Sequence, residues 1–513
     1  MKIEINENFK KAIDLLENSD KSLFITGKAG SGKSTLLSYF TNTTKKNVAV
    51  LAPTGVAALN IKGETIHSFF KFKPGITIDE AAKKGKKAKK NSFYHEIDLI
   101  IIDEISMVRA DLLDCVDVFL KMCLNNLKPF GNIRIVFIGD LYQLPPVITK
   151  EEKEVFNTLY ETPYFFSSNV MKDNLFKPEF IELEKIYRQN DPQFIELLNG
   201  IRNNTITDEQ ITILNQRVDE ESDIESGYIY LVSTNDQAEK INHEMLEKLE
   251  DATFTFDAAI DGEFEKKAFP TSTELKLKKN AQVMFLINSP DGLFVNGTIG
   301  KINSIDDSEI EICTTDNNYI TLKPYKWDLF KYDFDLKTKK LNQETIGSFK
   351  QYPIKLAWAI TIHKSQGQTF EKAVIDLSRG IFAHGQTYVA LSRCKSFEGL
   401  KLKKPIKKSH IILDYKVIKF LTEFQYTLSN EKCCKSDKIS IIQDAIANKK
   451  KLDITYLKIS DEKTQRTIIP SYVGELSYNN TKYIGVVAFC IKRQEERVFK
   501  IERILEISES KTI

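Results

Sequence analysis

Short apolar runs alternate with longer polar stretches through the first third of the chain. Four of these runs predict buried strands, at Ser22–Thr26, Val48–Ala52, Leu99–Asp103 and Ile133–Ile138. The stretches between them have helical character, and strands that alternate with helices are typical of a parallel sheet in an α/β domain. In such a sheet the ligand-binding residues lie at the carboxyl ends of the strands.

The pattern changes twice in the rest of the chain. A second α/β unit begins near Phe176, with strands predicted at Tyr228–Ser233 and Ala373–Leu377. Between them, over residues 251–351, short strands alternate with Gly, Asn and Asp turns, which predicts a small inserted β-barrel. From Ile439 to Ile507, one helical stretch followed by three strand-like runs predicts a separate tail domain.

Length and composition place the chain among soluble, multidomain proteins. Its 513 residues exceed what one core can organise, and about three or four domains are expected. No apolar run reaches the roughly 18 residues of a membrane span, and the N-terminus lacks the apolar core of a signal peptide. The seven cysteines match neither a disulfide framework nor a zinc site. We therefore expect a reduced, cytoplasmic protein that does not enter membranes.

The net charge of +2 does not by itself indicate a nucleic-acid partner. Any grip on a phosphodiester backbone must come from local positive charge. Two segments are locally basic, Lys83–Lys90 and Lys401–Lys408. Each of them suits either a solvated face or a contact with phosphate.

The run Gly27–Ser34 reads G-x-x-x-x-G-K-S between an apolar strand and a helical stretch. This is the phosphate-binding loop of nucleoside triphosphatases, in the strand–loop–helix context that the motif needs. Lys33 is expected to reach the β- and γ-phosphates, and the Ser34 hydroxyl to ligate Mg²⁺. The nucleotide-binding residues predicted from this segment are Gly27, Ala29, Gly30, Ser31, Gly32, Lys33, Ser34 and Thr35.

Two further strand ends complete the predicted nucleotide site. The strand at 99–103 delivers Asp103, a candidate Mg²⁺ ligand, and Glu104, a candidate base for the attacking water. The strand at 133–138 is followed by a polar turn that brings Gln143 near the same edge, where its amide could sense the γ-phosphate.

Three loops outside this site have no features of a nucleotide-phosphate site, and their residues suit contacts with a single nucleic-acid strand. The segments Ala52–Asn60, Gly63–Phe70 and Thr361–Gln368 combine small hydroxyls, backbone donors, histidines and aromatics. A hydrolase dyad of His363 and Ser365 is rejected because no G-x-S-x-G elbow or acid partner frames it. His67 suits a packed histidine nearly as well as a contact residue.

In their order, these motifs resemble the Pif family of superfamily-one DNA helicases, close to RecD-like enzymes. The segments that carry the resemblance are Gly27–Ser34, Ala52–Asn60, Gly63–Phe70, Ile101–Val108, Gly139–Val147, Leu183–Asp191, Ala357–Gln368 and Gly385–Arg393. The resemblance implies an α/β fold with two RecA-like P-loop domains, 1–175 and 176–250 with 352–405, around ATP. It also implies a β-barrel insertion at 251–351 and a duplex-splitting wedge at about 71–95.

The resemblance further implies ATP- and Mg²⁺-dependent 5′→3′ unwinding from a 5′ single-stranded tail, in replication, repair and recombination. Single-stranded and forked DNA are the expected partners, with one copy of the chain acting on DNA. Arg188 and Arg393 take the positions of arginine fingers, which stabilise charge on the transferring phosphoryl group, and Gly367 joins the nucleotide site. The expected DNA contacts are Pro53, Thr54, Gly55, His67, Phe70, Asn235, Thr361, His363, Lys364, Ser365 and Gln366.

Two features extend or depart from this resemblance. The family usually carries an adenine-reading glutamine before the first helix, where this chain has Phe9, so the preference among nucleoside triphosphates stays open. The tail, 437–513, resembles a mainly β WYL domain without the Trp-Tyr-Leu triplet. Its implied ligand-site residues are Tyr456, Arg466, Arg493, Arg497 and Arg503. The alternative is a small domain that only packs on the motor.

Two rival functions remain open at this point. In the first, the tail binds a strand and the motor only switches its state. In the second, the chain is a subunit of a RecD-like nuclease complex, although no nuclease cluster of acidic and lysine residues is recognisable.

Overall fold

The computed structural model describes residues 6–90, 92–148, 150–189, 191–220, 227–264, 266–289, 291, 293–306, 309–315, 317–335, 340–459, 461–478 and 481–510. The chain forms two compact units. Unit 1 comprises Met1–Arg202 and Ile206–Ile412, and unit 2 comprises Asn203–Thr205 and Leu413–Ile513. Among the described residues, no helix has the length and apolar character needed to cross a membrane.

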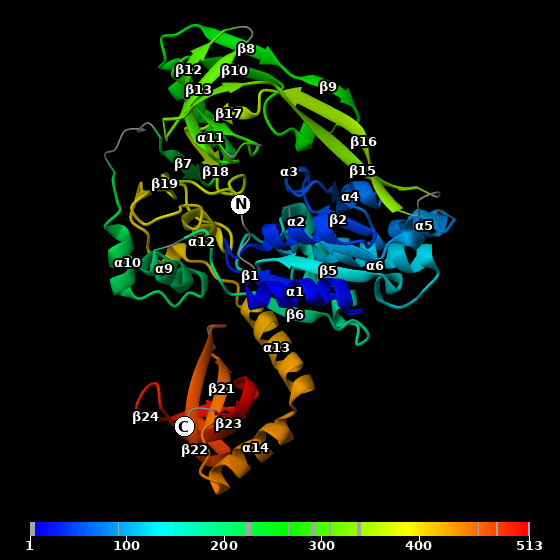
Figure 1. Cartoon of the computed structure of the whole chain (residues 1–513), viewed down its shortest axis with the longest axis vertical. Helices are drawn as coiled ribbons and strands as arrows, with labels where there is room; N and C mark the ends of the chain where they lie inside the picture. The colour runs from blue at the N-terminus through cyan, green and yellow to red at the C-terminus, as the bar shows by residue number, and fades with distance from the viewer. Residues whose placement is uncertain are drawn as a thin grey trace. The chain divides into compact units, whose positions relative to one another are not determined.

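Unit 1 begins with a six-stranded parallel sheet whose strand order is β3-β2-β4-β5-β1-β6 (Figure 1). The strands are β1 (Leu23–Gly27), β2 (Val48–Ala52), β3 (Glu64–Thr65), β4 (Leu99–Ile102), β5 (Arg134–Gly139) and β6 (Glu179–Leu183). The helices of this region are α1 (Glu7–Asn18), α2 (Lys33–Thr43), α3 (Gly55–Asn60), α4 (Ile66–Phe69), α5 (Ile78–Ala88), α6 (Ala110–Leu124), α7 (Lys150–Leu159) and α8 (Asn169–Lys172). All four strands predicted in this region are confirmed to within one or two residues.

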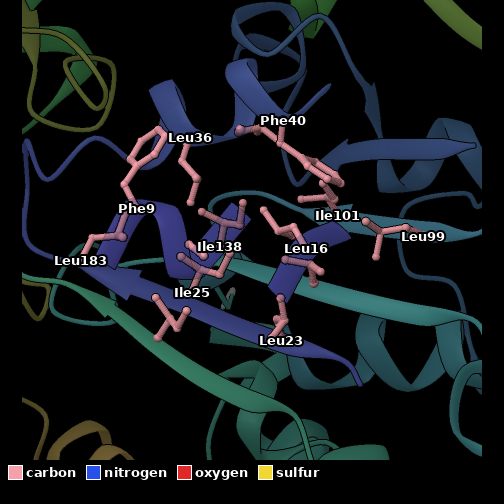
Figure 2. Close-up of a cluster of buried hydrophobic side chains, with 14 of the residues drawn as sticks. Phe9, Leu16, Leu23, Ile25, Leu36, Phe40, Leu99, Ile101, Ile138 and Leu183 are labelled. Carbon is pink, nitrogen blue, oxygen red and sulfur yellow. The ribbon is translucent and has the colours of Figure 1, made fainter. Parts of the chain in front are cut away.

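An apolar cluster holds α1 and α2 against this sheet (Figure 2). Phe9 of α1 is only 3% exposed and packs with Ile25 of β1 and Leu183 of β6 in this cluster. The aromatic side chain at this position therefore belongs to the hydrophobic core. Burying an apolar side chain of this size contributes about 2–3 kcal/mol.

Strand β6 corrects the expected boundary at residue 175. Glu179–Leu183 pairs in parallel with β1, from Leu23↔Glu179 to Gly27↔Leu183, so it completes the first sheet. Its alternation of polar and apolar residues gave no sign of which sheet it would join. The first RecA-like domain therefore extends past residue 183.

The second sheet of unit 1 has four parallel strands in the order β18-β7-β19-β20. These are β7 (Ile229–Val232), β18 (Ala359–Thr361), β19 (Ala373–Asp376) and β20 (Leu400–Leu402). The helices that accompany them are α9 (Pro192–Arg202), α10 (Asp208–Asn215), α11 (Asn235–Glu247) and α12 (Gln386–Leu391).

The inserted region is mainly β, as expected, and side chains of its strands share one hydrophobic core that includes Leu277, Val283 and Ile312. The described strands form a five-stranded sheet β14-β13-β12-β11-β17, a pair β10-β8 and a three-stranded sheet β15-β16-β9. Their bounds are β8 (Thr253–Asp257), β9 (Ala259–Gly262), β10 (Glu274–Lys278), β11 (Gln282–Phe285), β12 (Ile299–Ile305), β13 (Ile310–Thr314), β14 (Tyr319–Leu322), β15 (Tyr325–Asp335), β16 (Lys340–Gln351) and β17 (Ile354–Leu356). Strand β17 also carries the insertion past its expected end at residue 351.

The long hairpin β15–β16 reaches from the insertion to α4 and the edge of the first sheet (Figure 1). Tyr332 anchors it there, because its hydroxyl accepts a hydrogen bond from the Val50 N–H at 3.0 Å. The Tyr332 N–H in turn donates to the Glu64 carboxylate at 3.2 Å. Burial raises the pKa of Glu64, whereas hydrogen bonds from Ser68 and Tyr332 act in the opposite direction.

The segment expected to form the wedge, about 71–95, contains helix α5, which packs on α6. Gly85 makes this close approach possible, because a Cβ there would lie 2.4 Å from the Phe119 carbonyl oxygen. Most lysines of the run Lys83–Lys90 are exposed. The basic run is therefore the open side of an amphipathic helix.

Unit 2 contains two helices and one antiparallel sheet of order β24-β23-β22-β21-β25. The elements are α13 (Tyr415–Lys432), α14 (Lys435–Ala447), β21 (Leu452–Leu457), β22 (Lys463–Tyr478), β23 (Thr481–Cys490), β24 (Glu495–Lys500) and β25 (Ile504–Glu509). The expectation of three strands was wrong by two, and unit 2 begins earlier than residue 437 because α13 belongs to it.

Candidate functional site

The strand order of the first sheet sorts the predicted site residues into two groups. The strands β4, β5 and β1 are neighbours, and after them come the Asp103–Glu104 pair, the Asp140–Gln143 turn and the phosphate-binding loop. Strands β2 and β3 lie beside them, followed by Thr54 and His67. One edge of the sheet thus carries the predicted nucleotide-binding residues next to residues predicted to contact single-stranded nucleic acid.

Glycines shape the phosphate-binding loop. Gly30 and Gly32 have φ values of 76° and 89°, a left-handed conformation that other residues rarely adopt. A Cβ at Gly30 would also lie 2.4 Å from the Arg188 Cβ. The loop leads directly into α2, whose N-terminus favours an anion.

Lys33 and Ser31 fit a polyphosphate. The Lys33 ammonium donates to the carbonyl oxygens of Gly27 at 2.6 Å and Lys28 at 3.1 Å. Its pKa is lowered by burial, against the opposing effect of Asp140, Glu104 and Asp103. The buried Ser31 Oγ has no hydrogen-bond partner in the described part of the chain. An unsatisfied buried hydroxyl near a half-buried cation is the setting that a phosphate oxygen would complete.

Asp103 and Glu104 form a buried carboxylate pair at the end of β4. Burial and the neighbouring Glu104 raise the pKa of Asp103 to about 7. Burial also raises the pKa of Glu104, whereas Lys33 and Arg393 favour its charged form. A bound cation would reverse these shifts, because it stabilises ionised carboxylates.

The turn after β5 is built around the buried Asp140. Its carboxylate accepts from Gln143 Nε2 at 3.3 Å and lies 3.6 Å from the Arg202 guanidinium. Arg202 in turn lies over the Tyr142 ring, 3.8 Å from its centroid. Asp140 and Arg202 were not among the predicted site residues, although Asp140 stands in one of the motifs.

Both predicted arginines lie at the nucleotide site, and both come from segments that follow strand β6 in the chain. Arg188 donates to the carbonyl oxygens of Ser392 at 3.3 Å and Gly367 at 3.5 Å. Arg393 is 1% exposed and donates to the carbonyl oxygens of Val389 and Gln368. Burial and the adjacent Arg188 lower the pKa of Arg393 to about 9. Two such close cations are suited to an anionic ligand.

One cavity of about 840 Å³ brings most of these groups together. Tyr187, Lys372 and Lys395 also line it and were not predicted. Tyr187 stands in the segment Leu183–Asp191 without an assigned role, and the two lysines lie outside the motifs. The predicted residues along the cavity wall are Ala29, Gly30, Ser31, Gly32, Lys33, Ser34, Thr35, Glu104, Gln143, Arg188, Gly367 and Arg393. Gly27 and Asp103 are not part of this wall.

A hydrogen bond from the loop to α12 also joins the two sheets of unit 1. The Ala29 N–H donates to the Tyr388 hydroxyl at 3.0 Å, and Tyr388 is 4% exposed. The third residue of the phosphate-binding loop is therefore held by the second sheet. Tyr388 stands in the segment Gly385–Arg393, and its sequence context alone does not indicate this contact.

The side chains expected to contact single-stranded DNA differ in their exposure to solvent. Thr54, Asn235 and Lys364 are exposed, and Pro53, His67 and His363 are half-buried. Asn235 and His363 follow β7 and β18, which pair in parallel with Val232 opposite Thr361. Gly55 is half-buried, and a Cβ there would lie 2.7 Å from the Ala268 Cβ of the insertion.

Three of the residues expected to contact DNA, Phe70, Thr361 and Ser365, have buried side chains. Phe70 is 1% exposed and lies in an aromatic cluster, with its ring 5.2 Å from Phe119 and 5.4 Å from Phe72. Thr361 accepts the Lys364 N–H, and Ser365 donates to the Ile362 carbonyl oxygen. These two side chains stabilise the turn that presents His363 and Lys364.

Gln366 also differs from expectation, since its side chain points to the nucleotide site. Its Nε2 donates to Glu104 Oε2 at 3.1 Å and to Gln143 Oε1 at 3.3 Å.

Two residues near His363 were missed by the motif analysis. The Phe382 side chain is 63% exposed and its ring lies parallel to that of His363, with centroids 6.5 Å apart. Lys355 of β17 lies near Lys364, and burial together with that neighbour lowers its pKa to about 8. An exposed aromatic beside paired lysines suits stacked bases and a phosphate backbone.

In unit 2, two of the five predicted ligand residues line the same cavity. Tyr456 and Arg503 line a cavity together with Tyr415 and Ile418 of α13. Arg466 is buried, whereas Arg493 and Arg497 are exposed, and Arg497 forms an ion pair with Glu495 at 2.9 Å.

Comparisons with known proteins agree with this geometry. Residues 3–212 match the PIF1-like helicase family, and residues 437–509 match the WYL domain. The ATP-dependent DNA helicase Pif1 of Bdellovibrio bacteriovorus is 32% identical over 433 residues, which cover 82% of this chain and 93% of that protein. The chain therefore belongs to the PIF1-like helicase family.

Solved structures of a relative cover the same region. The crystal structure of Bacteroides sp Pif1 in complex with ADP-AlF4 is 36% identical, with a TM-score of 0.75 over 82% of this chain and 97% of that chain. The same protein bound to ssDNA is 37% identical, with a TM-score of 0.57 over 82% and 96%. This chain is thus an ATP-dependent DNA helicase with two RecA-like domains and a C-terminal WYL domain.

Proposed function

We propose that this helicase translocates 5′→3′ along single-stranded DNA and opens duplexes from a 5′ tail during replication, repair and recombination. One observation carries the proposal. A single cavity gathers the phosphate-binding loop, Glu104 and two arginines, while both sheets that meet there also present exposed strand-type loops.

The catalytic roles follow from the contacts. Lys33 would leave its carbonyl partners for the β- and γ-phosphates, and Glu104 would accept the proton of the attacking water. Gln143 would sense the γ-phosphate by its amide. Arg188 and Arg393 would stabilise the charge that develops on the transferring group, an effect worth about 10³–10⁵ in rate for such arginines.

The residues present also fit Mg²⁺. Within the described ranges no three His, Cys, Asp or Glu side chains could hold a metal by themselves. Mg²⁺ commonly needs only one or two protein ligands beside substrate phosphates. Ser34 and Asp103 would hold it, and the ion would neutralise phosphate charge.

Strand binding would use both sheets. Pro53, Thr54 and His67 would act from the first domain, and Asn235, His363 and Lys364 from the second, with Lys355 and Phe382 beside them. The cavity would close when ATP binds and reopen after hydrolysis. Each change would alter the affinity for single-stranded DNA, first of one domain's residues and then of the other's. Such a difference between states is what directed movement requires.

The test is unwinding of two duplexes that differ only in having a 5′ or a 3′ single-stranded tail, with ATP and Mg²⁺. We expect opening of the 5′-tailed duplex alone. Opening of the 3′-tailed duplex would contradict the polarity. Opening of neither, with hydrolysis still stimulated by single-stranded DNA, would favour the sensor function over the motor.

Lys33→Ala is the matched catalytic control. We expect hydrolysis and unwinding to fall to about one hundredth or less, while thermal unfolding and strand binding stay close to those of the unchanged protein. Unwinding by Lys33→Ala would show that the motor assignment is wrong.

We further infer that one copy acts on each DNA molecule, in the cytoplasm, and that unit 2 binds a strand or nucleotide-type ligand through Tyr456 and Arg503. The aromatic ring and guanidinium on one cavity support this choice. Light scattering on a short-tailed duplex measures the number of copies. Loss of ligand binding in Arg503→Ala, but not in Arg497→Ala, tests the cavity.

A further inference from the structure

Gln366 stands where the two domains meet at the catalytic carboxylate. Its amide group belongs to the second sheet, whereas its two acceptors, Glu104 Oε2 and Gln143 Oε1, follow strands of the first sheet. One NH₂ group therefore joins both sheets at the candidate base. An uncharged donor is well suited here because burial disfavours the ionised form of Glu104.

The loop that carries Gln366, residues 361–368, is stiff. Ser365 is 0% exposed, its N–H donates to the Thr361 carbonyl oxygen at 3.0 Å, and its hydroxyl donates to the Ile362 carbonyl oxygen at 2.8 Å. The Gln366 N–H donates to the His363 carbonyl oxygen at 3.2 Å. These hydrogen bonds connect the residues at the two ends of the loop.

The two ends of the 361–368 loop have different surroundings. At one end, His363 and Lys364 face the proposed strand path with Phe382. At the other end, the carbonyl oxygens of Gly367 and Gln368 accept hydrogen bonds from Arg188 and Arg393. The side chain of Gln366 is the element of the loop that reaches the base itself.

We infer that Gln366 is a positioning residue that transmits strand binding at His363 and Lys364 to Glu104. Its amide fixes one carboxylate oxygen, so that the other is directed at the attacking water only when the loop is correctly placed by the strand. This inference rests on the proposed function, and it replaces the expectation that Gln366 contacts DNA directly.

The experiment is steady-state ATP hydrolysis by full-length Gln366→Ala during titration with single-stranded DNA. We expect the half-saturating DNA concentration to stay within about threefold, while kcat at saturating DNA falls at least about tenfold and by more than the rate without DNA falls. A raised half-saturating concentration with full kcat at saturation would make Gln366 a strand contact and overturn the inference. An equal loss with and without DNA would overturn transmission as well.

Gln366→Glu guards against a misfolded variant, because it keeps the side-chain length and replaces the donor by an acceptor. It should lose stimulation as Gln366→Ala does, with unchanged thermal unfolding; retained stimulation would contradict the inference. Asn296→Ala is the matched control, since it removes the other side-chain amide contact of this loop, from Gln368 Nε2 to Asn296 Oδ1. It should keep full stimulation.

His363→Ala changes the end of the same loop that faces the proposed path of the DNA. Its half-saturating DNA concentration should rise while kcat at saturation is largely kept, the opposite split from Gln366→Ala. If the unchanged protein shows no stimulation by DNA, the proposed function fails first, which separates that failure from a failure of this inference.

Discussion

Phe70 stands in a helicase motif and Phe382 lies outside the motifs, and the structure gives the two phenylalanines different roles. Phe70 is 1% exposed and packs with Phe72, Tyr94 and Phe119, whereas Phe382 is 63% exposed beside His363. A core aromatic contributes through burial, and an exposed one is available for stacking on bases.

Substituting each phenylalanine by alanine should separate these roles. Phe70→Ala should lower the free energy of unfolding by about 3–5 kcal/mol, because it leaves a cavity in the aromatic cluster. Phe382→Ala should leave stability nearly unchanged and weaken single-strand affinity by about 1–3 kcal/mol. Denaturant unfolding and fluorescence anisotropy measure the two quantities. If Phe70→Ala lost affinity for single-stranded DNA without losing stability, Phe70 would be a DNA contact after all.

The buried carboxylate of Glu64 gives a pH-dependent prediction. Its pKa is raised by burial, so the folded state holds its proton more tightly than the unfolded state. The contribution of Glu64 to stability is therefore greatest below its ordinary pKa and is lost as pH rises through the raised value. Glu64→Gln keeps an acceptor for the Tyr332 N–H and removes this dependence.

We expect Glu64→Gln to be more stable than the unchanged protein at pH 8, by about 1 kcal/mol or roughly 2–4 °C in Tm. The difference should shrink towards pH 5. Thermal unfolding across this range measures it. A difference that does not vary with pH would mean that Glu64 keeps an ordinary pKa in the folded protein.

Among the elements, helix α5 shows how one glycine sets the distance between two helices. The Cβ that Gly85 lacks would lie 2.4 Å from the Phe119 carbonyl oxygen and 3.0 Å from the Met122 Cβ of α6. The exposed lysines of α5 are thereby held on a fixed support, as a wedge requires.

Gly85→Val should push α5 away from α6, at a cost of about 1–3 kcal/mol for overpacking. If α5 acts as the wedge, unwinding of the 5′-tailed duplex should fall more than hydrolysis stimulated by single-stranded DNA. Ala82→Val, which adds a side chain at a half-buried position of the same helix, is the control. Equal losses of unwinding and hydrolysis would exclude a separate wedge role.

At the scale of the whole molecule, the division into two units predicts which truncation the motor tolerates. The Bacteroides structure is matched over 97% of its length by 82% of this chain, and residues 437–509 of the tail match a separate family, the WYL domain. Helix α13 belongs to unit 2, where its Ser429 hydroxyl donates to the Leu505 carbonyl oxygen at 2.6 Å.

A chain ending at Ile412 should therefore keep strand-stimulated hydrolysis and unwinding within about threefold, which for a free-energy difference is under 1 kcal/mol. A chain ending at Ser436 should be less soluble, because it retains α13 without the sheet that covers Ser429. Size-exclusion chromatography and the unwinding assay compare the two. Loss of unwinding in the shorter chain would make unit 2 part of the motor.

The sequence by itself determined the local chemistry of this protein. Short continuous apolar runs, which are typical of buried parallel strands, predicted the strands β1, β2, β4, β5, β7 and β19. The phosphate-binding loop and the Asp103–Glu104 pair were predicted from motifs at strand ends, whereas both arginines were predicted only from the resemblance to the Pif family.

Only the tertiary structure decided which sheet a strand joins and which way a side chain points. Strand β6 belongs to the first sheet through pairing with β1, and the insertion carries a long hairpin, β15–β16. Phe70, Thr361 and Ser365 stand in strand-binding motifs and yet are buried, while Gln366 reaches Glu104 across 262 positions of sequence. Burial and contacts between distant segments depend on packing, and motif spacing carries no information about them.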